Sequence, residues 1–297
     1  MRLFGITRPF PVLKAMSLVT SKRASDMALA APGRDGRMLT LVPWRGRALV
    51  GTSQSGGVVQ PADLSVRSDD VDAFIDDANV AFPSLKLSRS DVTLVHRGIV
   101  AASVDKSGRA DLKPAAEIID HGNGAMTVVG VKFTTARGVA ERAIDAVGRS
   151  LQRRLRRSKT AMTPLPGAAI ADHEALAIET ARALHIDVPL PVIQHLIRLY
   201  AEAAADIIRL MHKRPEFGAP LSAECATIQA EIVHTIRREM ALKLTDVLIR
   251  RTGLGSAGEP PVDAVRTAAR IAQAELGWDD ARTAEEIDEV RRFYAID

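Results

Sequence analysis

Apolar residues recur with two different spacings along this chain, and the spacing changes near residue 160. Before that point, short apolar runs are separated by Gly, Pro and Asn, a pattern typical of strands and turns. After it, apolar side chains recur every three or four residues, as they do on one face of a helix. The pattern predicts a first part that mixes strands with helices and a second part built only of helices.

The first part is expected to contain a hairpin, because apolar runs at residues 38–42 and 47–52 flank the turn residues 43–46. Ser68 is expected to cap a helix that ends before Pro83. Its buried face is predicted to carry Val71, Phe74, Ile75 and Ala78. Further strands are expected at residues 91–100, 117–121 and 125–131.

Residues 125–157 are expected to form a buried strand that leads directly into a helix. Thr134 or Thr135 is the expected helix cap. A strand followed by a capped helix is half of a βαβ unit, and the first 150 residues do not obviously supply all of its partner strands. The helix is predicted to bury Val139, Ala143, Ile144, Val147, Leu151 and Leu155.

The second part is expected to be an antiparallel bundle or cap domain. Thr283 and Glu286 have the spacing of a capping box, and the Pro- and Gly-containing residues 163–167 are typical of a linker. We therefore expect domains at 1–160 and 161–297. The helices are expected over residues 172–185, 191–212, 221–252, 263–276 and 283–294.

Composition narrows the functional classes. A chain of 297 residues can bury a large core. The single cysteine, Cys225, excludes an internal disulfide framework and lacks a zinc-binding spacing, so the reducing cytoplasm is the expected compartment. No apolar run reaches the roughly 18 residues of a membrane span, and residues 1–10 lack the apolar core of a signal peptide. A net charge of +4 does not by itself demand nucleic acid.

Basic residues nevertheless gather between Arg149 and Lys159. The run is interpreted first as structural, because Leu151 and Leu155 continue the apolar stripe and arginines favour a helix C-terminus. Contact with an anionic membrane surface is the alternative. Nucleic acid is disfavoured, because no aromatic residue interleaves the run to stack on bases.

Two short motifs suggest chemistry that their surroundings do not support. Residues 253–258, GLGSAG, match the dinucleotide fingerprint G-x-G-x-x-G, but they follow a predicted helix and precede Pro260 and Pro261. The fingerprint needs a strand before it and a helix after it, so we interpret Gly253 as a helix C-cap. Residues 51–55, GTSQS, lack the final glycine of a nucleophile elbow.

Residues 129–137, VGVKFTTAR, place a glycine and a lysine between a predicted strand and a predicted helix. Free amides and a lysine at a helix start would stabilise negative charge nearby, for example on the carbonyl edge of a reduced flavin. An ordinary capped helix with a surface lysine explains the same residues equally well.

This segment resembles the G-G-K-x-T-T-Y-R signature of FAD-dependent glycerol-3-phosphate dehydrogenases, and reads GVKFTTAR at residues 130–137. Residues 42–53 are similar to the family's I-P-W-x-G-x-x-x-I-G-T-T hairpin, and residues 165–170 to its L-P-G-G-x-I linker. Residues 239–252 look like a long helix of its C-terminal domain. The four stretches follow the family's order and together cover most of the chain.

The resemblance implies an α+β or α/β fold. A mixed sheet in a partial FAD- and substrate-binding domain of the DAO-like flavoprotein fold would be followed by an all-α C-terminal domain. It implies hydride transfer from C2 of glycerol 3-phosphate or a similar alcohol to flavin N5, with quinone or oxygen as electron acceptor. Lys132 would be catalytic, and Thr52, Ser53, His96 and Arg97 would bind substrate. The FAD contacts would be Gly130, Val131, Lys132, Phe133, Thr134 and Thr135.

Two departures qualify these expectations. The family begins with a strand, G-x-G-x-x-G and helix that hold the FAD diphosphate, and this sequence lacks that arrangement, so we expect a separate or missing N-terminal FAD-binding portion. The family's G-V-R-P carries an arginine for substrate phosphate, and the matching residue here is Val100. His96 or Arg97 would have to replace it, and strand alternation puts only His96 on the face of Val100.

Two alternatives remain open at the level of sequence. The chain could be a non-catalytic relic or interaction module, which Val100 and the absent fingerprint favour. It could instead resemble an amino-acid oxidase, in which a cation such as Arg97 would bind a carboxylate. The expected location is cytoplasmic, with peripheral contact to the inner face of the membrane as a possibility.

Overall fold

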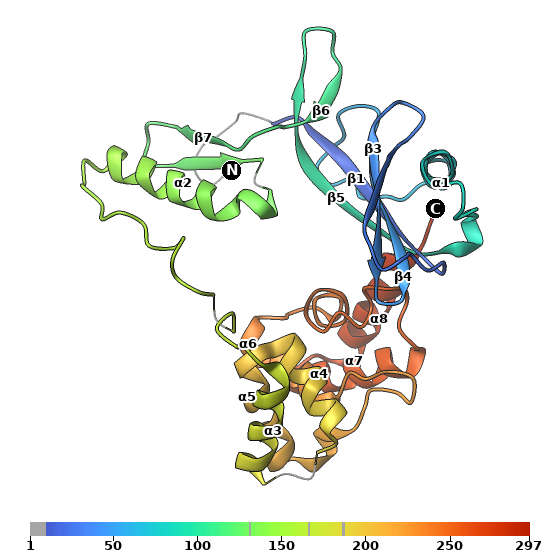
Figure 1. The fold of residues 1–297 in the computed structure, drawn as a ribbon, viewed down its shortest axis with the longest axis vertical. Helices are drawn as coiled ribbons and strands as arrows, with labels where there is room; N and C mark the ends of the chain where they lie inside the picture. Colours follow the sequence, from blue (N-terminus) through green and yellow to red (C-terminus); the bar gives the residue numbers. More distant parts are fainter. Residues whose placement is uncertain (1–9, 131, 166, 186–187) are drawn as a thin grey trace.

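A computed structural model describes residues 10–130, 132–165, 167–185 and 188–297. Its largest sheet has six strands in the order β2-β3-β4-β1-β5-β6 (Figure 1), and all of its pairings are antiparallel. The expected fold class is confirmed, although the sheet is antiparallel and not mixed. The strands are β1 (Val12–Thr20), β2 (Leu29–Pro32), β3 (Met38–Trp44), β4 (Arg47–Gln54), β5 (Val92–Val104) and β6 (Ala110–Leu112).

Strand β1, which the sequence pattern did not reveal, lies in the middle of this sheet between β4 and β5. Leu13, Leu18 and Val19 in it are fully buried, which explains why it is central. A bulge between Met16 and Ser17 shifts its register against β4. The expected hairpin β3–β4 and the strand β5 are confirmed.

Helix α1 (Ser68–Ala81) covers one face of the sheet. The predicted apolar face is confirmed, because Val71, Phe74 and Ile75 share a core with sheet residues such as Leu18 and Val50. The predicted cap is wrong: Arg67 is the N-cap and Ser68 is the first helical residue. The Ser68 hydroxyl instead accepts a hydrogen bond from the Arg89 guanidinium, which ties the helix to residues 89–91.

Asp91 is a stabilising carboxylate at the start of β5. It accepts hydrogen bonds from Ser88 and Ser21 and lies 3.4 Å from Lys22 Nζ. The hydrogen bonds from Ser88 lower the pKa of Asp91 from 3.8 to about 2. Because the folded pKa is depressed, the stabilisation is complete above the unfolded value and is lost as pH falls from about 4 to about 2.

Asp91→Asn is therefore expected to flatten the dependence of folding stability on pH in this acid range. Urea unfolding at several pH values would measure it, with exposed Asp111→Asn as the control. An unchanged acid dependence in Asp91→Asn would contradict the assignment.

The strand and the helix expected within residues 125–157, half of a βαβ unit, both form, but the strand pairs antiparallel and not within a parallel sheet. Strands β7 (Glu117–Asp120) and β8 (Met126–Val129) make a separate antiparallel hairpin, and helix α2 (Ala136–Ser150) follows them. This unit meets the rest of the first part at the end of β8, where Gly130 lies against Lys113, and otherwise lies away from the large sheet and from the C-terminal helices (Figure 1).

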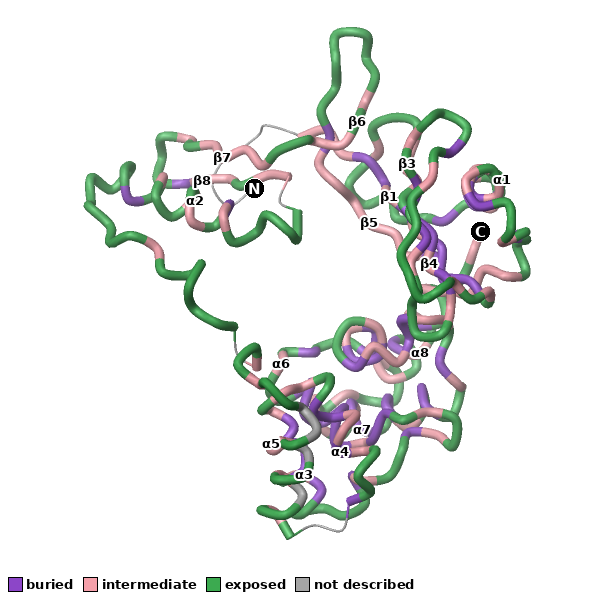
Figure 2. Tube along the Cα trace, viewed as in Figure 1, coloured by how far each residue is buried: buried purple, intermediate pink, exposed green. Residues whose placement is uncertain are grey.

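The predicted buried stripe of α2 is mostly exposed. Val139 is buried, but Ile144 is 59% exposed and Leu151 62% exposed (Figure 2). The helix ends at Ser150, and the chain then folds back so that Arg153 N donates to Gly148 O. Most of the arginine run therefore lies beyond the helix, on exposed chain.

The remaining helices build a second core of fully buried residues such as Ile207, Ile232 and Leu244. The long helix expected over 221–252 is interrupted. Helix α6 ends at Glu239, its C-cap Met240 has a left-handed φ of +56°, and a short π-helix covers Asp246–Arg251. None of the described helices has the length and apolar character that crossing a bilayer requires. The helices are α3 (His173–Leu184), α4 (Leu190–Tyr200), α5 (Ala204–Lys213), α6 (Gln229–Glu239), α7 (Val262–Leu276) and α8 (Asp280–Tyr294).

The GLGSAG residues join the helices to the sheet. Trp44 Nε1 donates to Ser256 O at 2.8 Å, and Thr93 Oγ1 donates to Ala257 O at 2.8 Å. Tyr294 of α8 donates from its hydroxyl to Gly255 O at 2.8 Å. Gly253 has the positive φ, +65°, that was expected of a C-cap.

Candidate functional site

A hollow of about 300 Å³ lies where β5, the end of β6 and the strand-to-helix segment meet. Its lining includes Val100 of β5, Lys113, Gly130 and Lys132. Two stretches that were singled out in the sequence, the Val100 region and the segment at 130–137, are thus brought together. The rest of the lining is apolar: Ile99, Ala101 and Leu112.

Gly130 needs to be glycine in this backbone conformation. Its φ is +81°, which side chains other than glycine rarely adopt. A Cβ added there would stand 3.1 Å from Lys113 Cδ and 3.4 Å from Ala115 O. The residue lets the chain turn sharply out of β8 while staying close to Lys113.

The turn after Gly130 is a single 3-10 helix over Phe133–Thr135, with Lys132 as its extended N-cap. Thr135 donates from its amide and its hydroxyl to Lys132 O, at 3.1 and 3.2 Å. Thr135 is the N-cap residue of α2, as expected, although its side chain makes no cap hydrogen bond. Phe133 is fully exposed, and Lys132 and Thr134 are exposed. The predicted contact Val131 lies outside the described residues.

Lys113 is a site residue that sequence reasoning missed. Its amide donates to Ala101 O at 2.9 Å, which extends the β5–β6 pairing and turns the side chain toward Gly130. Its ammonium pairs with Glu117 at 2.8 Å. No local motif marks this lysine, because its position depends on pairing between two strands.

His96 lies on the same sheet face as Val100 but not in the same hollow. The two residues pair with Ser17 and Leu13 of β1, and four residues of strand separate them by about 13 Å. Burial lowers the pKa of His96, the charge of Arg97 lowers it further, and a hydrogen bond with the Ser256 backbone opposes both. His96 is thus a neutral imidazole at the junction with residues 253–258.

Arg97 points to the opposite face of the sheet. Its guanidinium donates to Leu64 O at 3.0 Å and to Phe293 O at 2.6 Å, and it lies over the Phe293 ring. Burial lowers the pKa of Arg97 and Asp297 partly opposes this. Through these contacts, Arg97 connects the sheet to the end of α8.

Thr52 and Ser53 lie at the β4 side of the bulge. Thr52 is exposed, whereas Ser53 pairs with Met16 and lines a second hollow of about 630 Å³ between the sheet and α1. Lys14 and Asp70 also line that hollow. The structure therefore brings together Gly130, Lys132 and Val100, but distributes Ser53, His96 and Arg97 over other surroundings.

Comparison with known proteins finds glycerol-3-phosphate dehydrogenases among the relatives of this chain. The family described as the C-terminal domain of alpha-glycerophosphate oxidase matches residues 158–283. A glycerol-3-phosphate dehydrogenase of Synechocystis sp. is 31% identical over 228 residues, covering 74% of this chain and 40% of that protein. The mitochondrial enzyme of Bos taurus is 26% identical over 282 residues, covering 90% of this chain and 37% of that protein.

The fold of this chain is also similar to that of a solved structure. A structure of glycerol-3-phosphate dehydrogenase from Bacillus halodurans, complexed with FAD, superposes with a TM-score of 0.74 at 21% identity. The match covers 96% of this chain and 57% of that one. The chain thus spans less than half the length of the curated relatives named above.

Proposed function

We propose that this chain forms the substrate-side and helical part of a FAD-dependent oxidoreductase that resembles glycerol-3-phosphate dehydrogenase. Residues 158–283 match the C-terminal domain of alpha-glycerophosphate oxidase, and a glycerol-3-phosphate dehydrogenase is 31% identical over 228 residues. The reaction is oxidation at C2 of glycerol 3-phosphate or a similar alcohol, with quinone or oxygen as final acceptor. The observation that carries the proposal is the hollow that Lys132 and Gly130 share with Val100. We retain a domain boundary near residue 160 as part of the proposal.

The residues of the hollow fit one edge of a flavin ring. Gly130 lets the backbone approach closely, and Lys132 supplies a cation at the start of the exposed turn. The flavin supplies hydride acceptance when bound. Lys132 holds positive charge at that edge, where negative charge develops. The described residues offer no comparable cradle for the FAD diphosphate, so we propose that an additional FAD-binding portion provides it.

Substrate phosphate can be recognised without an arginine at position 100. Lys113 lines the hollow beside Val100, and its ammonium lies 2.8 Å from the Glu117 carboxylate. An ammonium is a good point charge for phosphate. We therefore assign phosphate binding to Lys113. His96 lies about 13 Å along β5 from Val100, beyond the reach of a small substrate held in this hollow, so it takes no part in the assignment.

The exposed apolar stripe of α2 supports docking to a FAD-binding portion. Ile144, Val147 and Leu151 form this stripe, and each is more than a third exposed. Such a stripe on an amphipathic helix normally packs against another element. The arginine run that follows, Arg149 to Lys159, would then border this interface or a membrane surface.

The proposal is tested with the holoprotein, meaning this chain together with its FAD-binding portion. Glycerol 3-phosphate is expected to bleach the flavin absorption and to reduce an added dye at least tenfold faster than glycerol does, because only the phosphate contacts Lys113. Bleaching by an amino acid and not by glycerol 3-phosphate would favour the oxidase alternative. If a well-folded holoprotein showed neither reaction, the remaining interpretation would be the non-catalytic module that Val100 favours.

Ile144→Asp is the matched test of docking. It places a charge on the exposed stripe and is expected to weaken association of the two portions without destabilising the isolated chain, since Ile144 is 59% exposed. Asp145→Asn, next to it on α2, is the control and should associate normally. Normal association of Ile144→Asp would refute the assigned interface.

A further inference from the structure

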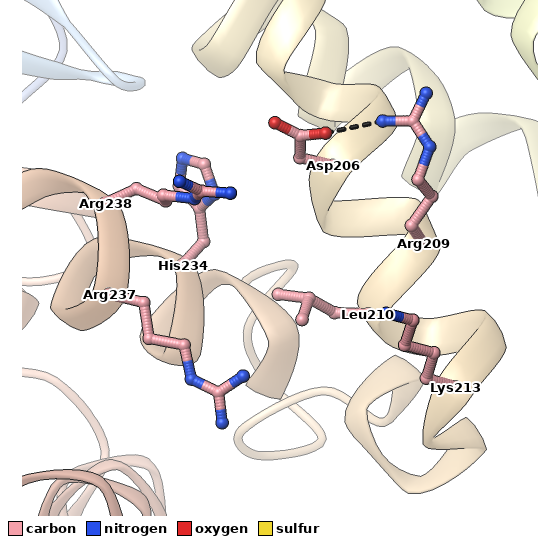
Figure 3. A pocket seen from close by; sticks show the side chains of 7 residues that line it. All are labelled: Asp206, Arg209, Leu210, Lys213, His234, Arg237 and Arg238. Carbon is pink, nitrogen blue, oxygen red and sulfur yellow. Dashed lines mark hydrogen bonds and ion pairs between the residues drawn. The ribbon is translucent and has the colours of Figure 1, made fainter.

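A third hollow, of about 370 Å³, lies among the C-terminal helices and is formed by α5 and α6. Figure 3 shows its side chains coming from the two facing helices: Asp206, Arg209, Leu210 and Lys213 from α5, and His234, Arg237 and Arg238 from α6. The volume is in the range of small-molecule sites. It shares no lining residue with the hollow around Lys132.

Positive charge dominates the lining and is only partly neutralised. Arg209 donates to Asp206 at 2.5 Å, and Arg237 donates twice to Glu275, at 2.6 and 2.7 Å. Within the described part of the chain, Lys213 and Arg238 form no ion pair. Two cations that have no ion-pair partner among the described residues thus face the hollow from opposite helices.

His234 adds a polar wall between them. Its side chain is buried, its ring packs edge-on against Tyr200 at 5.5 Å, and its Nε2 lies 3.7 Å from Glu239 Oε1. Burial lowers the pKa of His234; Glu239, Asp206 and Glu231 raise it, and Arg238 lowers it. A neutral imidazole at the wall can hydrogen-bond a ligand without adding charge.

The position of the cations is not explained by the helices alone. Lys213, Arg237 and Arg238 stand in the last turns of α5 and α6, where cations favour the helix dipole. That preference is satisfied on any side of a helix. The helix dipole therefore does not explain why these three cationic side chains line the same hollow, in which Leu210 forms an apolar floor.

We propose that this hollow binds the phosphate group of a small soluble phosphorylated compound. Arg209 and Arg237 each retain N–H donors beyond those given to their carboxylates, and Arg238 and Lys213 supply unpaired charge. Leu210 and the stems of the cations contact the rest of the ligand. The proposal does not depend on flavin chemistry.

The test uses the full chain and two probes, inorganic phosphate and pyrophosphate, by titration calorimetry at constant ionic strength. Wild type is expected to bind at least one probe saturably. Arg238→Gln and Lys213→Gln are each expected to weaken binding about tenfold, the loss typical of one charge-assisted hydrogen bond. Arg198→Gln is the matched control, because Arg198 is an exposed cation in the last turn of α4 and does not line the hollow.

Equal binding by Arg238→Gln, Lys213→Gln and wild type would overturn the site. So would a wild-type chain that binds neither probe, including one that binds only phosphatidylglycerol vesicles, because the ligand would then be a membrane surface. Circular dichroism of each variant excludes loss of folding as the cause. Since no flavin or substrate oxidation is measured, failure here leaves the proposed function untouched.

Discussion

Replacing Lys132 with methionine is expected to lower the rate of flavin reduction by the holoprotein about 100- to 1,000-fold, the usual cost of removing one preorganised electrostatic donor. Methionine keeps an unbranched side chain of similar length and removes the charge. Lys132 is exposed and makes no side-chain contact that holds the described fold together. Stopped-flow absorbance of the flavin measures the step directly.

Two companion variants separate charge from structure. Lys132→Arg should recover part of the rate, because it keeps the charge. Lys106→Met removes an exposed lysine from the β5–β6 turn and should leave the rate unchanged. A Lys132→Met enzyme with the wild-type rate would show that Lys132 is an ordinary surface lysine.

Lys113→Met, in the same hollow, is expected to act differently. If Lys113 binds phosphate equally in substrate and transition state, its loss raises KM and leaves kcat nearly unchanged. Lys132 and Lys113 thus line one hollow, but their substitutions are expected to change different quantities: the rate of flavin reduction for Lys132 and KM for Lys113.

The sequence predicted those elements whose signal is local. The β3–β4 hairpin and α1 were found because a turn or an apolar stripe is complete within a short segment. Strand β1 was missed although it is central, because its irregular run of polar and apolar residues includes the buried Lys14. Lys14 is satisfied only in three dimensions, by Ser65 O at 2.8 Å and by Asp70.

The stripe of α2 shows the opposite error. Its periodicity is genuine, yet Ile144 and Leu151 are exposed in the described structure. Periodicity tells which side of a helix is apolar but does not identify what covers it. The sequence also predicted a strand followed by a helix, which is half of a βαβ unit. That pattern does not specify which other strand pairs with the predicted strand.

The candidate site was likewise found in part. Gly130 and Lys132 stand out locally, and strand alternation correctly separated His96 from Arg97. Lys113 could not be found, because only the register of β5 with β6 places it beside Gly130.

Buried carboxylates are a further class that patterns do not reveal. Glu286 was expected to cap α8 together with Thr283, but Asp279 is the cap and accepts from Arg282 N. Glu286 is fully buried and accepts a hydrogen bond from Leu244 N at 2.7 Å. Glu286 of α8 therefore holds in place the chain segment that follows α6, a role that its position in the sequence did not reveal.

Glu231 on α6 has the same character and should carry a large share of the stability of the helical part. It is fully buried and accepts from Tyr200 Oη at 2.9 Å and from Ile228 N at 2.8 Å. His195 Nε2 lies 3.3 Å from its Oε1 without hydrogen-bond geometry. Burial and the charge of Glu231 raise the pKa of Tyr200, so the tyrosine stays a proton donor.

Glu231→Ala is expected to lower the free energy of unfolding by about 3 kcal/mol, because it leaves the Tyr200 hydroxyl and the Ile228 amide without an acceptor and opens a cavity. Urea unfolding followed by far-ultraviolet circular dichroism measures it, since most of the helices lie in this part of the chain. Tyr200→Phe removes one of these bonds and should cost less, about 1 kcal/mol. Glu216→Ala, an exposed glutamate in the same part, should change stability by no more than about 0.5 kcal/mol. A Glu231→Ala chain as stable as Glu216→Ala would mean that the buried carboxylate does not organise α4 and α6.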